Sequence, residues 1–138
     1  MSQKGFTLTE LIIAVAIFAL MAAIAVPRYA AINTQTRQAS IEALASHVNN
    51  SARLTNKVWS SAGSPDEIVI EGRIIDIEHG FPTDQSIGSI VVNNGDYLFG
   101  DGYWKHKQTG RDERCAVLYI PPAADGGQYQ VISYTEGC

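Results

Sequence analysis

The sequence predicts an α+β fold, in which a long N-terminal hydrophobic helix continues into an amphipathic half that packs on an antiparallel β-sheet. Three observations predict it: sixteen consecutive apolar residues from Leu11 to Val26, an apolar stripe at helical spacing beyond them, and short strand-like segments in the rest of the chain. At 138 residues the chain is long enough for one core plus an extension and too short for two ordinary domains.

The apolar run is predicted to be a membrane anchor. From Phe6 to Val26 there are 21 residues, and a helix of that length spans roughly 30 Å, the thickness of a bilayer core. A secretory signal would carry its small-residue cleavage site after the apolar region. Here the candidate break, between Gly5 and Phe6, precedes that region, so cleavage would leave the anchor on the mature chain.

The helix is predicted to continue past Pro27, which removes one backbone hydrogen bond and can kink the helix without ending it. Apolar residues beyond it recur at three-, four- and seven-residue intervals. This stripe should pack on a globular domain, and a separate first helix is the alternative that the pattern leaves open. Its members are Ile41, Leu44, Ala45, Val48, Ala52 and Trp59.

Strands are predicted where runs rich in β-branched and aromatic residues are bounded by turn residues. We expect one hairpin about Gly72-Arg73 and a second about Asn93–Asp96. The predicted strand segments are 67–71, 74–77, 90–92, 97–99, 115–120 and 129–134.

Charge and motif content argue against nucleic-acid binding through bulk charge and against catalysis. Ten Lys and Arg against fourteen Asp and Glu give a net charge of -4. The three histidines, His47, His79 and His106, lack metal-ligand spacing, and no nucleophile motif is present. No enzyme activity, cofactor or metal is therefore expected. The segment Tyr103–Lys107 raises DNA or a surface glycan as a partner, but a solvated loop with one core aromatic is the preferred reading.

The N-terminal motifs resemble those of a type IV pilin precursor, the class that prepilin peptidase cuts after a glycine. The resemblance rests on residues 4–11, Lys-Gly-Phe-Thr-Leu-Thr-Glu-Leu, on the apolar run, and on residues 25–29, Ala-Val-Pro-Arg-Tyr. The C-terminal part, with Cys115 and the final Gly137-Cys138, is similar to the disulfide-closed end of type IVa pilins, particularly the mannose-sensitive haemagglutinin type.

This resemblance implies the pilin fold and a division of the chain. Residues 1–5 would be the leader peptide, 6–27 the transmembrane and filament-core helix, and 28–138 the globular head. The head would consist of an amphipathic helix half, 28–59, and a β-sheet domain, 60–138. The resemblance also implies cleavage between Gly5 and Phe6 and N-methylation of Phe6.

The resemblance assigns Glu10 a role in subunit assembly, and the physics of a carboxylate at the edge of an apolar helix supports it. Such a group is costly in a membrane and should have a cationic partner. Cleavage would create one, because the new α-amino group of Phe6 lies one helical turn before Glu10. The alternative is an interfacial glutamate that stabilises the positive end of the helix.

Cys115 and Cys138 are expected to pair. An exported domain sits in an oxidising compartment, and the closed loop would contribute on the order of 3 kcal/mol by the chain-entropy argument. Two buried free thiols are the alternative.

The predicted function is that of a structural subunit of a type IV pilus, which leaves the inner membrane and polymerises into an extracellular filament for adhesion, motility or DNA uptake. Its expected partners are other pilin subunits, prepilin peptidase and the inner-membrane assembly machinery. The alternatives are a type II secretion pseudopilin and a membrane-anchored periplasmic binding domain that never polymerises.

Overall fold

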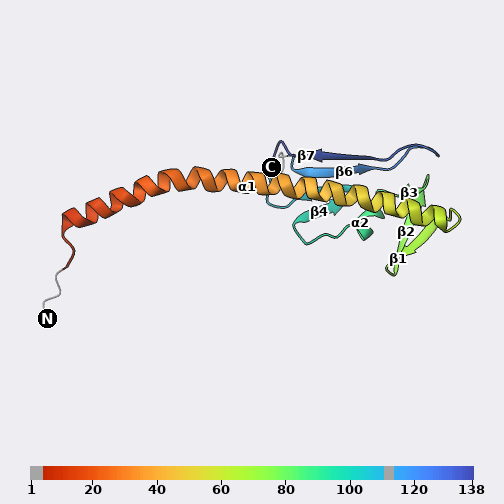
Figure 1. The fold of residues 1–138 in the computed structure, drawn as a ribbon, viewed down its shortest axis with the longest axis horizontal. Coiled ribbons are helices and arrows are strands. Elements are labelled where there is room, and N and C mark those ends of the chain that lie inside the picture. The colour runs from red at the N-terminus through yellow and green to blue at the C-terminus, as the bar shows by residue number, and fades with distance from the viewer. Residues whose placement is uncertain (1–4, 111–113) are drawn as a thin grey trace. The chain divides into compact units, whose positions relative to one another are not determined.

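The computed structural model describes residues 5–110 and 114–138 (Figure 1), so Met1 to Lys4 of the expected leader lie outside the described residues. The chain divides into two compact units, Met1–Gln35 and Thr36–Cys138, which we call the N-terminal and C-terminal units.

The first element is helix α1, Leu8–Ser61, which contains Pro27. It is continuous through Pro27 and ends two residues after the expected end of the amphipathic helix half at residue 59. Its termination uses two residues with positive φ, Gly63 at 86° and Ser64 at 62°. The Ser64 amide donates to the Trp59 carbonyl oxygen at 3.1 Å, which satisfies one carbonyl of the last turn.

The two parts of α1 differ in burial. Every described residue from Gly5 to Ile32 is exposed within the chain. Within the C-terminal unit, α1 buries one stripe, which confirms the helical periodicity read from the sequence. The buried residues of α1 are Ile41, Leu44, Val48, Ala52 and Thr55. Thr55 is a polar member of this stripe, and its hydroxyl is satisfied because it donates to the Ser51 carbonyl oxygen at 2.8 Å.

The first sheet has three antiparallel strands in the order β1-β2-β3, at Glu67–Ile70, Arg73–Glu78 and Phe81–Pro82. The predicted first hairpin is confirmed. Its two turn residues are Glu71 and Gly72, with φ of 51° and 78°, rather than the expected Gly72-Arg73. Left-handed φ at both central residues matches the right-handed twist of the two strands.

The second sheet has four antiparallel strands in the order β4-β5-β6-β7. They are Tyr97–Gly100, Tyr103–His106, Ala116–Ile120 and Gln130–Tyr134. Strands β6 and β7 confirm the two C-terminal strands of the prediction. The sequence predicted one sheet, whereas the C-terminal unit contains two, joined by a hydrogen bond of 2.9 Å from the Tyr119 hydroxyl to the Pro82 carbonyl oxygen.

The second predicted hairpin is wrong. Residues Ile87–Ile90 form the short helix α2 instead of leading into a strand at 90–92. The hairpin partner of β4 is β5, across Asp101 and Gly102 with φ of 47° and 72°. The expected solvated loop at Tyr103–Lys107 is therefore also wrong, because Tyr103–His106 is strand β5. The one core aromatic expected there is confirmed, because Trp104 is fully buried.

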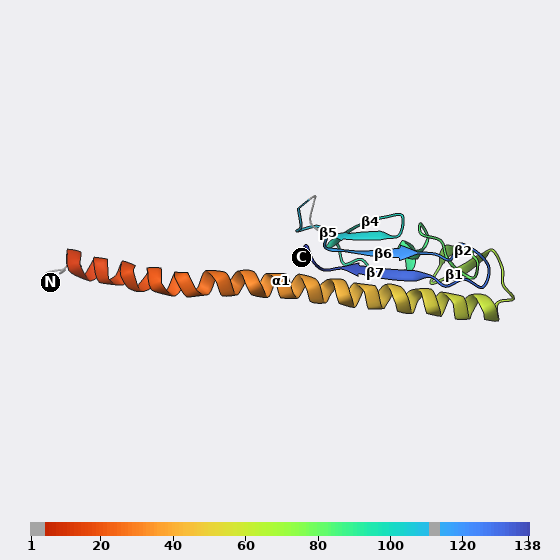
Figure 2. The ribbon, with the colours of Figure 1, turned by 90° about the horizontal axis from the view of Figure 1, so that it is seen from above.

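The core of the C-terminal unit lies between α1 and the second sheet. Figure 2 shows both sheets on one side of the part of α1 that belongs to this unit. Trp104 of β5 and Ile41 of α1 are fully buried in it, together with Val117 and Tyr119 of β6. Apolar burial of this kind supplies the main free energy that holds a helix on a sheet.

Candidate assembly segment and disulfide-closed tail

Thr7 and Glu10 form a reciprocal cap at the start of α1. The Glu10 carboxylate oxygen Oε2 accepts bonds of 2.8 Å from both the amide and the hydroxyl of Thr7. In return, the Glu10 amide donates to Thr7 Oγ1 at 3.3 Å. Threonine followed three residues later by glutamate is the capping-box pattern, and it satisfies amides that a helix start leaves free.

This cap was missed in the sequence analysis, although the Thr7-Leu8-Thr9-Glu10 spacing was a usable signal. It places the Glu10 carboxylate on donors of its own chain. Because Phe6 is here bonded to Gly5, its nitrogen is an amide and the expected ion pair with Glu10 has no amine to form with. The Glu10 carboxylate therefore has two alternative partners, the Thr7 donors of the cap and the Phe6 amine of the expected ion pair.

The apolar side chains around this segment are left uncovered by the residues that the structure describes. Phe6 is 92% exposed and Leu8 76% exposed. By length and composition, α1 contains a stretch apolar enough to cross a membrane. A contiguous exposed apolar surface of this kind marks a membrane or protein contact.

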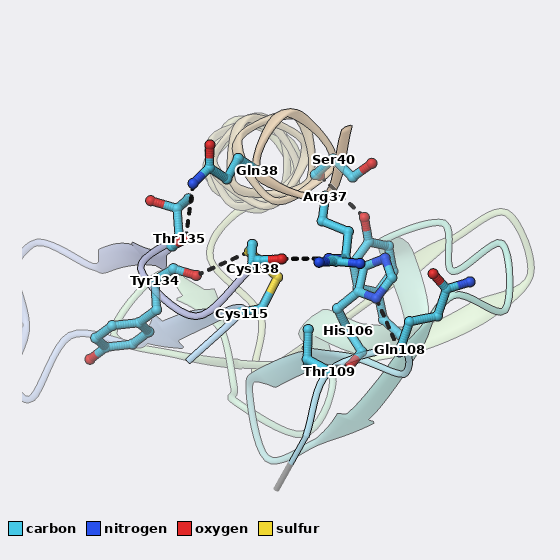
Figure 3. Close-up of a disulfide and its surroundings, with 11 residues drawn as sticks. Arg37, Gln38, Ser40, His106, Gln108, Thr109, Cys115, Tyr134, Thr135 and Cys138 are labelled. Carbon is cyan, nitrogen blue, oxygen red and sulfur yellow. Dashed lines mark hydrogen bonds between the residues drawn. A yellow bond between two sulfur atoms is a disulfide. The ribbon is translucent and has the colours of Figure 1, made fainter. Parts of the chain in front are cut away.

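Cys115 and Cys138 form a disulfide, which confirms the predicted pairing (Figure 3). The two residues are 23 positions apart in sequence with a Cα–Cα distance of 4.8 Å. Both are buried. The bond ties the end of the described chain to the residue before β6.

Side chains of α1 also hold this tail. Arg37 donates through Nε to the main-chain oxygen of Cys138 at 2.5 Å, and Gln38 donates through Nε2 to the Thr135 carbonyl oxygen at 3.4 Å (Figure 3). The Gly137 amide bonds the Arg114 carbonyl oxygen at 3.0 Å. The tail is thus fixed to both the helix and the sheet, and only the disulfide among these contacts was foreseen.

His106 lies close to the same tail, in the closing strand of the β4–β5 hairpin. Its Nδ1 accepts a bond of 3.2 Å from the Gln108 amide, and its ring meets that of Tyr97 edge-on at 5.5 Å. Burial lowers the pKa of His106 below its ordinary value, Asp96 opposes this shift, and Arg37 adds to it. The packing role expected for this histidine agrees with these contacts.

His79 and Asp125 form a contact that the sequence analysis did not foresee. The His79 Nδ1 atom lies 2.6 Å from Asp125 Oδ1, and Glu78 Oε1 lies 3.8 Å from the other ring nitrogen. His79 belongs to the β2–β3 turn and Asp125 to the loop between β6 and β7. No local motif could have paired residues 46 positions apart.

Residues 5–110 and 114–138 contain no group of three or more His, Cys, Asp or Glu side chains that could hold a metal ion. The largest pKa shift among the described tyrosines also has a structural cause. Burial raises the pKa of Tyr119, whose hydroxyl bonds Pro82.

Residues 1–26 match the family model described as the prokaryotic N-terminal methylation motif. The N-terminal segment therefore carries a prokaryotic N-terminal methylation motif. This segment includes the capped Thr7 and Glu10 and ends one residue before Pro27.

A curated relative agrees with this result. The chain is 44% identical over 50 residues to the type IV narrow pilus major component PilA5 of Thermus thermophilus. The match covers 36% of this chain and 43% of that protein, so it spans less than half the length of the relative. No solved structure shows a significant match to the chain.

Proposed function

We propose that the chain is the precursor of a structural subunit that polymerises through its N-terminal helix into an extracellular type IV pilus. The observation that carries this proposal is the exposed apolar surface of α1 from Leu8 to Ile32. A lipid bilayer covers such a surface before assembly, and the helices of neighbouring subunits cover it in a filament core.

The proposed mechanism is mechanical. Apolar helices leave the inner membrane and bury one another, so that helix–helix contacts replace helix–lipid contacts. The C-terminal units then form the outer surface of the filament. The role uses no catalytic residue, metal or cofactor of this chain.

Processing would prepare the helix for this step. Cleavage between Gly5 and Phe6 by prepilin peptidase creates the amine that is then methylated. The family model that describes a methylation motif supports this part of the proposal. In the mature chain, Glu10 would exchange the Thr7 donors for the cationic amine of Phe6, either its own or that of a neighbouring subunit.

The biological role proposed for the filament is surface attachment. The name of the Thermus relative, a narrow pilus major component, supports a pilus role for this chain. Motility and DNA uptake are alternative uses of the same filament, and the assembly machinery of the inner membrane would be the common partner in all three.

Electron microscopy of sheared cell surfaces tests the proposal. Cells that carry the gene should shed filaments whose main band is this chain, and deletion of the gene should remove them. A chain that stays in the inner-membrane fraction, with no sedimentable filament, would support the anchored periplasmic domain instead. Short filaments that form only together with a secretion system would support the pseudopilin.

A further inference from the structure

A groove of about 510 Å³ runs along one flank of α1 in the C-terminal unit. Arg53 and Lys57 of α1 line one wall, and Phe81 of β3 and Tyr129, just before β7, line the other. The two aromatic rings meet at a centroid distance of 4.9 Å. The groove therefore combines two cations with an aromatic wall, in a chain whose net charge is -4.

The polar groups at the base of the groove already have partners. The Tyr129 hydroxyl donates to Asn49 Oδ1 at 2.9 Å, and Asn56 Nδ2 donates to the Gly80 carbonyl oxygen at 2.8 Å. Arg53 and Lys57 are exposed, and within residues 5–110 and 114–138 neither forms an ion pair. The two cations are thus available to an anionic partner from outside the chain.

The opposite flank of α1 faces the β1–β2 hairpin. The outer face of this hairpin is acidic and aliphatic, which complements the cations and aromatic rings of the groove. In this hairpin Glu67 stands opposite Asp76, and Val69 stands opposite Ile74. Val69 is 68% exposed and Ile74 63% exposed. Like charges directly opposite each other destabilise a strand pair. This face therefore presents two carboxylates that lie opposite each other and two aliphatic side chains that remain exposed.

In the view of Figure 1, β7 lies above the C-terminal part of α1 and the β1–β2 hairpin lies below it, while Figure 2 shows both on the same side of the helix. The groove and the hairpin face are therefore separate surfaces at two edges of the same unit. A contact between two different surfaces of identical subunits is heterologous, and its repetition gives an open helical assembly when the rotation does not close a ring.

We propose that the groove at Arg53 and Lys57 of one subunit receives the outer face of the β1–β2 hairpin of a neighbouring copy, with Glu67 and Asp76 placed against the two cations. The aliphatic pair Val69 and Ile74 then covers the aromatic wall. This inference rests on the proposed function, because it names the contact that the C-terminal units make once the helices have assembled.

A second copy of the chain fits the groove better than an acidic polysaccharide does, because its hairpin matches both the charge and the apolar wall of the groove. The hairpin supplies both halves of the complement, carboxylates for the cations and aliphatic groups for the rings, and it leaves exposed the very groups that the contact would cover. A polysaccharide would satisfy the groove and leave the hairpin face as it is.

Charge reversal in the full-length chain tests the proposal. The variant Arg53→Glu with Lys57→Glu, and separately Glu67→Lys with Asp76→Lys, should each lower filament yield or shear resistance by roughly tenfold, because like charges then meet. The combination of all four changes should restore most of the loss. Glu42→Lys and Lys107→Glu are matched exposed controls that should assemble as the wild type does. A thermal melt of each purified subunit confirms that the fold is retained.

The outcomes separate this inference from the proposed function. Normal filaments from both reversed pairs would overturn the inference and leave the pilus role intact. Loss without rescue in the combined variant would also overturn it, since the groove would then have another occupant. Unchanged filaments with lost binding of an acidic polysaccharide in the Arg53→Glu, Lys57→Glu variant would assign the groove to that ligand instead. Absence of filaments from the wild-type chain would overturn both proposals.

Discussion

Thr7 and Glu10 hold each other at the start of α1, with two bonds of 2.8 Å to the glutamate carboxylate and one of 3.3 Å from its amide. Glu10 therefore has two separable properties, its capacity to accept hydrogen bonds and its negative charge. The cap needs only the first, whereas the proposed pairing with the amine of Phe6 needs the second.

Substitution of Glu10 distinguishes these two properties. Glu10→Gln keeps an oxygen acceptor at the capping position and removes the charge, and Glu10→Ala removes both. We expect both variants to insert in the inner membrane and to lose surface filaments by roughly a hundredfold or more, because the amine of Phe6 enters the filament core unpaired. Immunoblots of membrane and sheared fractions measure this.

The control for these variants is Glu42→Ala, an exposed helical carboxylate in the C-terminal unit, which should assemble nearly normally. The strains must lack any other pilin that could copolymerise. Normal filament yield from Glu10→Gln would show that the cap alone suffices and that the ion pair is not required.

The disulfide should matter for the stability of the C-terminal unit and not for membrane insertion. Cys115→Ser, Cys138→Ser and the double variant should each lower the free energy of unfolding by on the order of 3 kcal/mol, because the loop of 23 positions is no longer closed. Urea denaturation of detergent-solubilised subunits measures this. The double variant should not be less stable than either single variant, and wild-type stability in all three would contradict the role given to the bond.

His106 should make stability depend on pH. Its pKa is lowered in the folded state by burial, so as pH falls the unfolded chain takes up the proton first. Stability should be unaffected by this residue above its ordinary pKa of about 6.5 and should decrease as pH falls from there toward the lower folded-state pKa. Protonation would also break the bond that Nδ1 accepts from the Gln108 amide.

The measurement is the urea midpoint of the subunit between neutral and mildly acidic pH. His106→Gln, which cannot titrate, should lose that part of the pH slope, and the more exposed His47→Gln serves as the control. An unchanged slope in His106→Gln would show that another group causes the pH dependence.

The features that sequence analysis predicted well depend on local pattern. The buried stripe of α1 follows from the spacing of Ile41, Leu44, Val48 and Ala52, and the first hairpin follows from alternating residues about a glycine. The Cys115–Cys138 bond depends on no local pattern and was foreseen because two cysteines in a domain expected to be exported have one possible pairing.

The second hairpin was misplaced because two turn signals lie close together. Asn93 forms local bonds, accepting from the Gly95 amide at 3.0 Å and donating to the Tyr97 carbonyl oxygen at 3.1 Å, and these shape the loop between α2 and β4. Asp101-Gly102 is an equally strong hairpin signal, and it forms the turn between β4 and β5. Trp104 is fully buried in that second strand.

Features that depend on long-range packing had no signal in the sequence. The Arg37 bond to Cys138 joins residues 101 positions apart, and the contact between His79 and Asp125 joins two turns of different sheets. The groove at Arg53 and Lys57 likewise appears only when β3 and β7 lie beside α1.

The central claim is that this chain is cut before Phe6 and then builds a filament through its N-terminal helix. The most direct test is the intact mass of the main subunit in sheared surface filaments, together with the sequence of its N-terminal peptide. We predict a chain that runs from Phe6 to Cys138, with one added methyl group on the amine of Phe6 and both cysteines oxidised. A subunit of assembled filaments that retains Met1 to Gly5 would contradict the account.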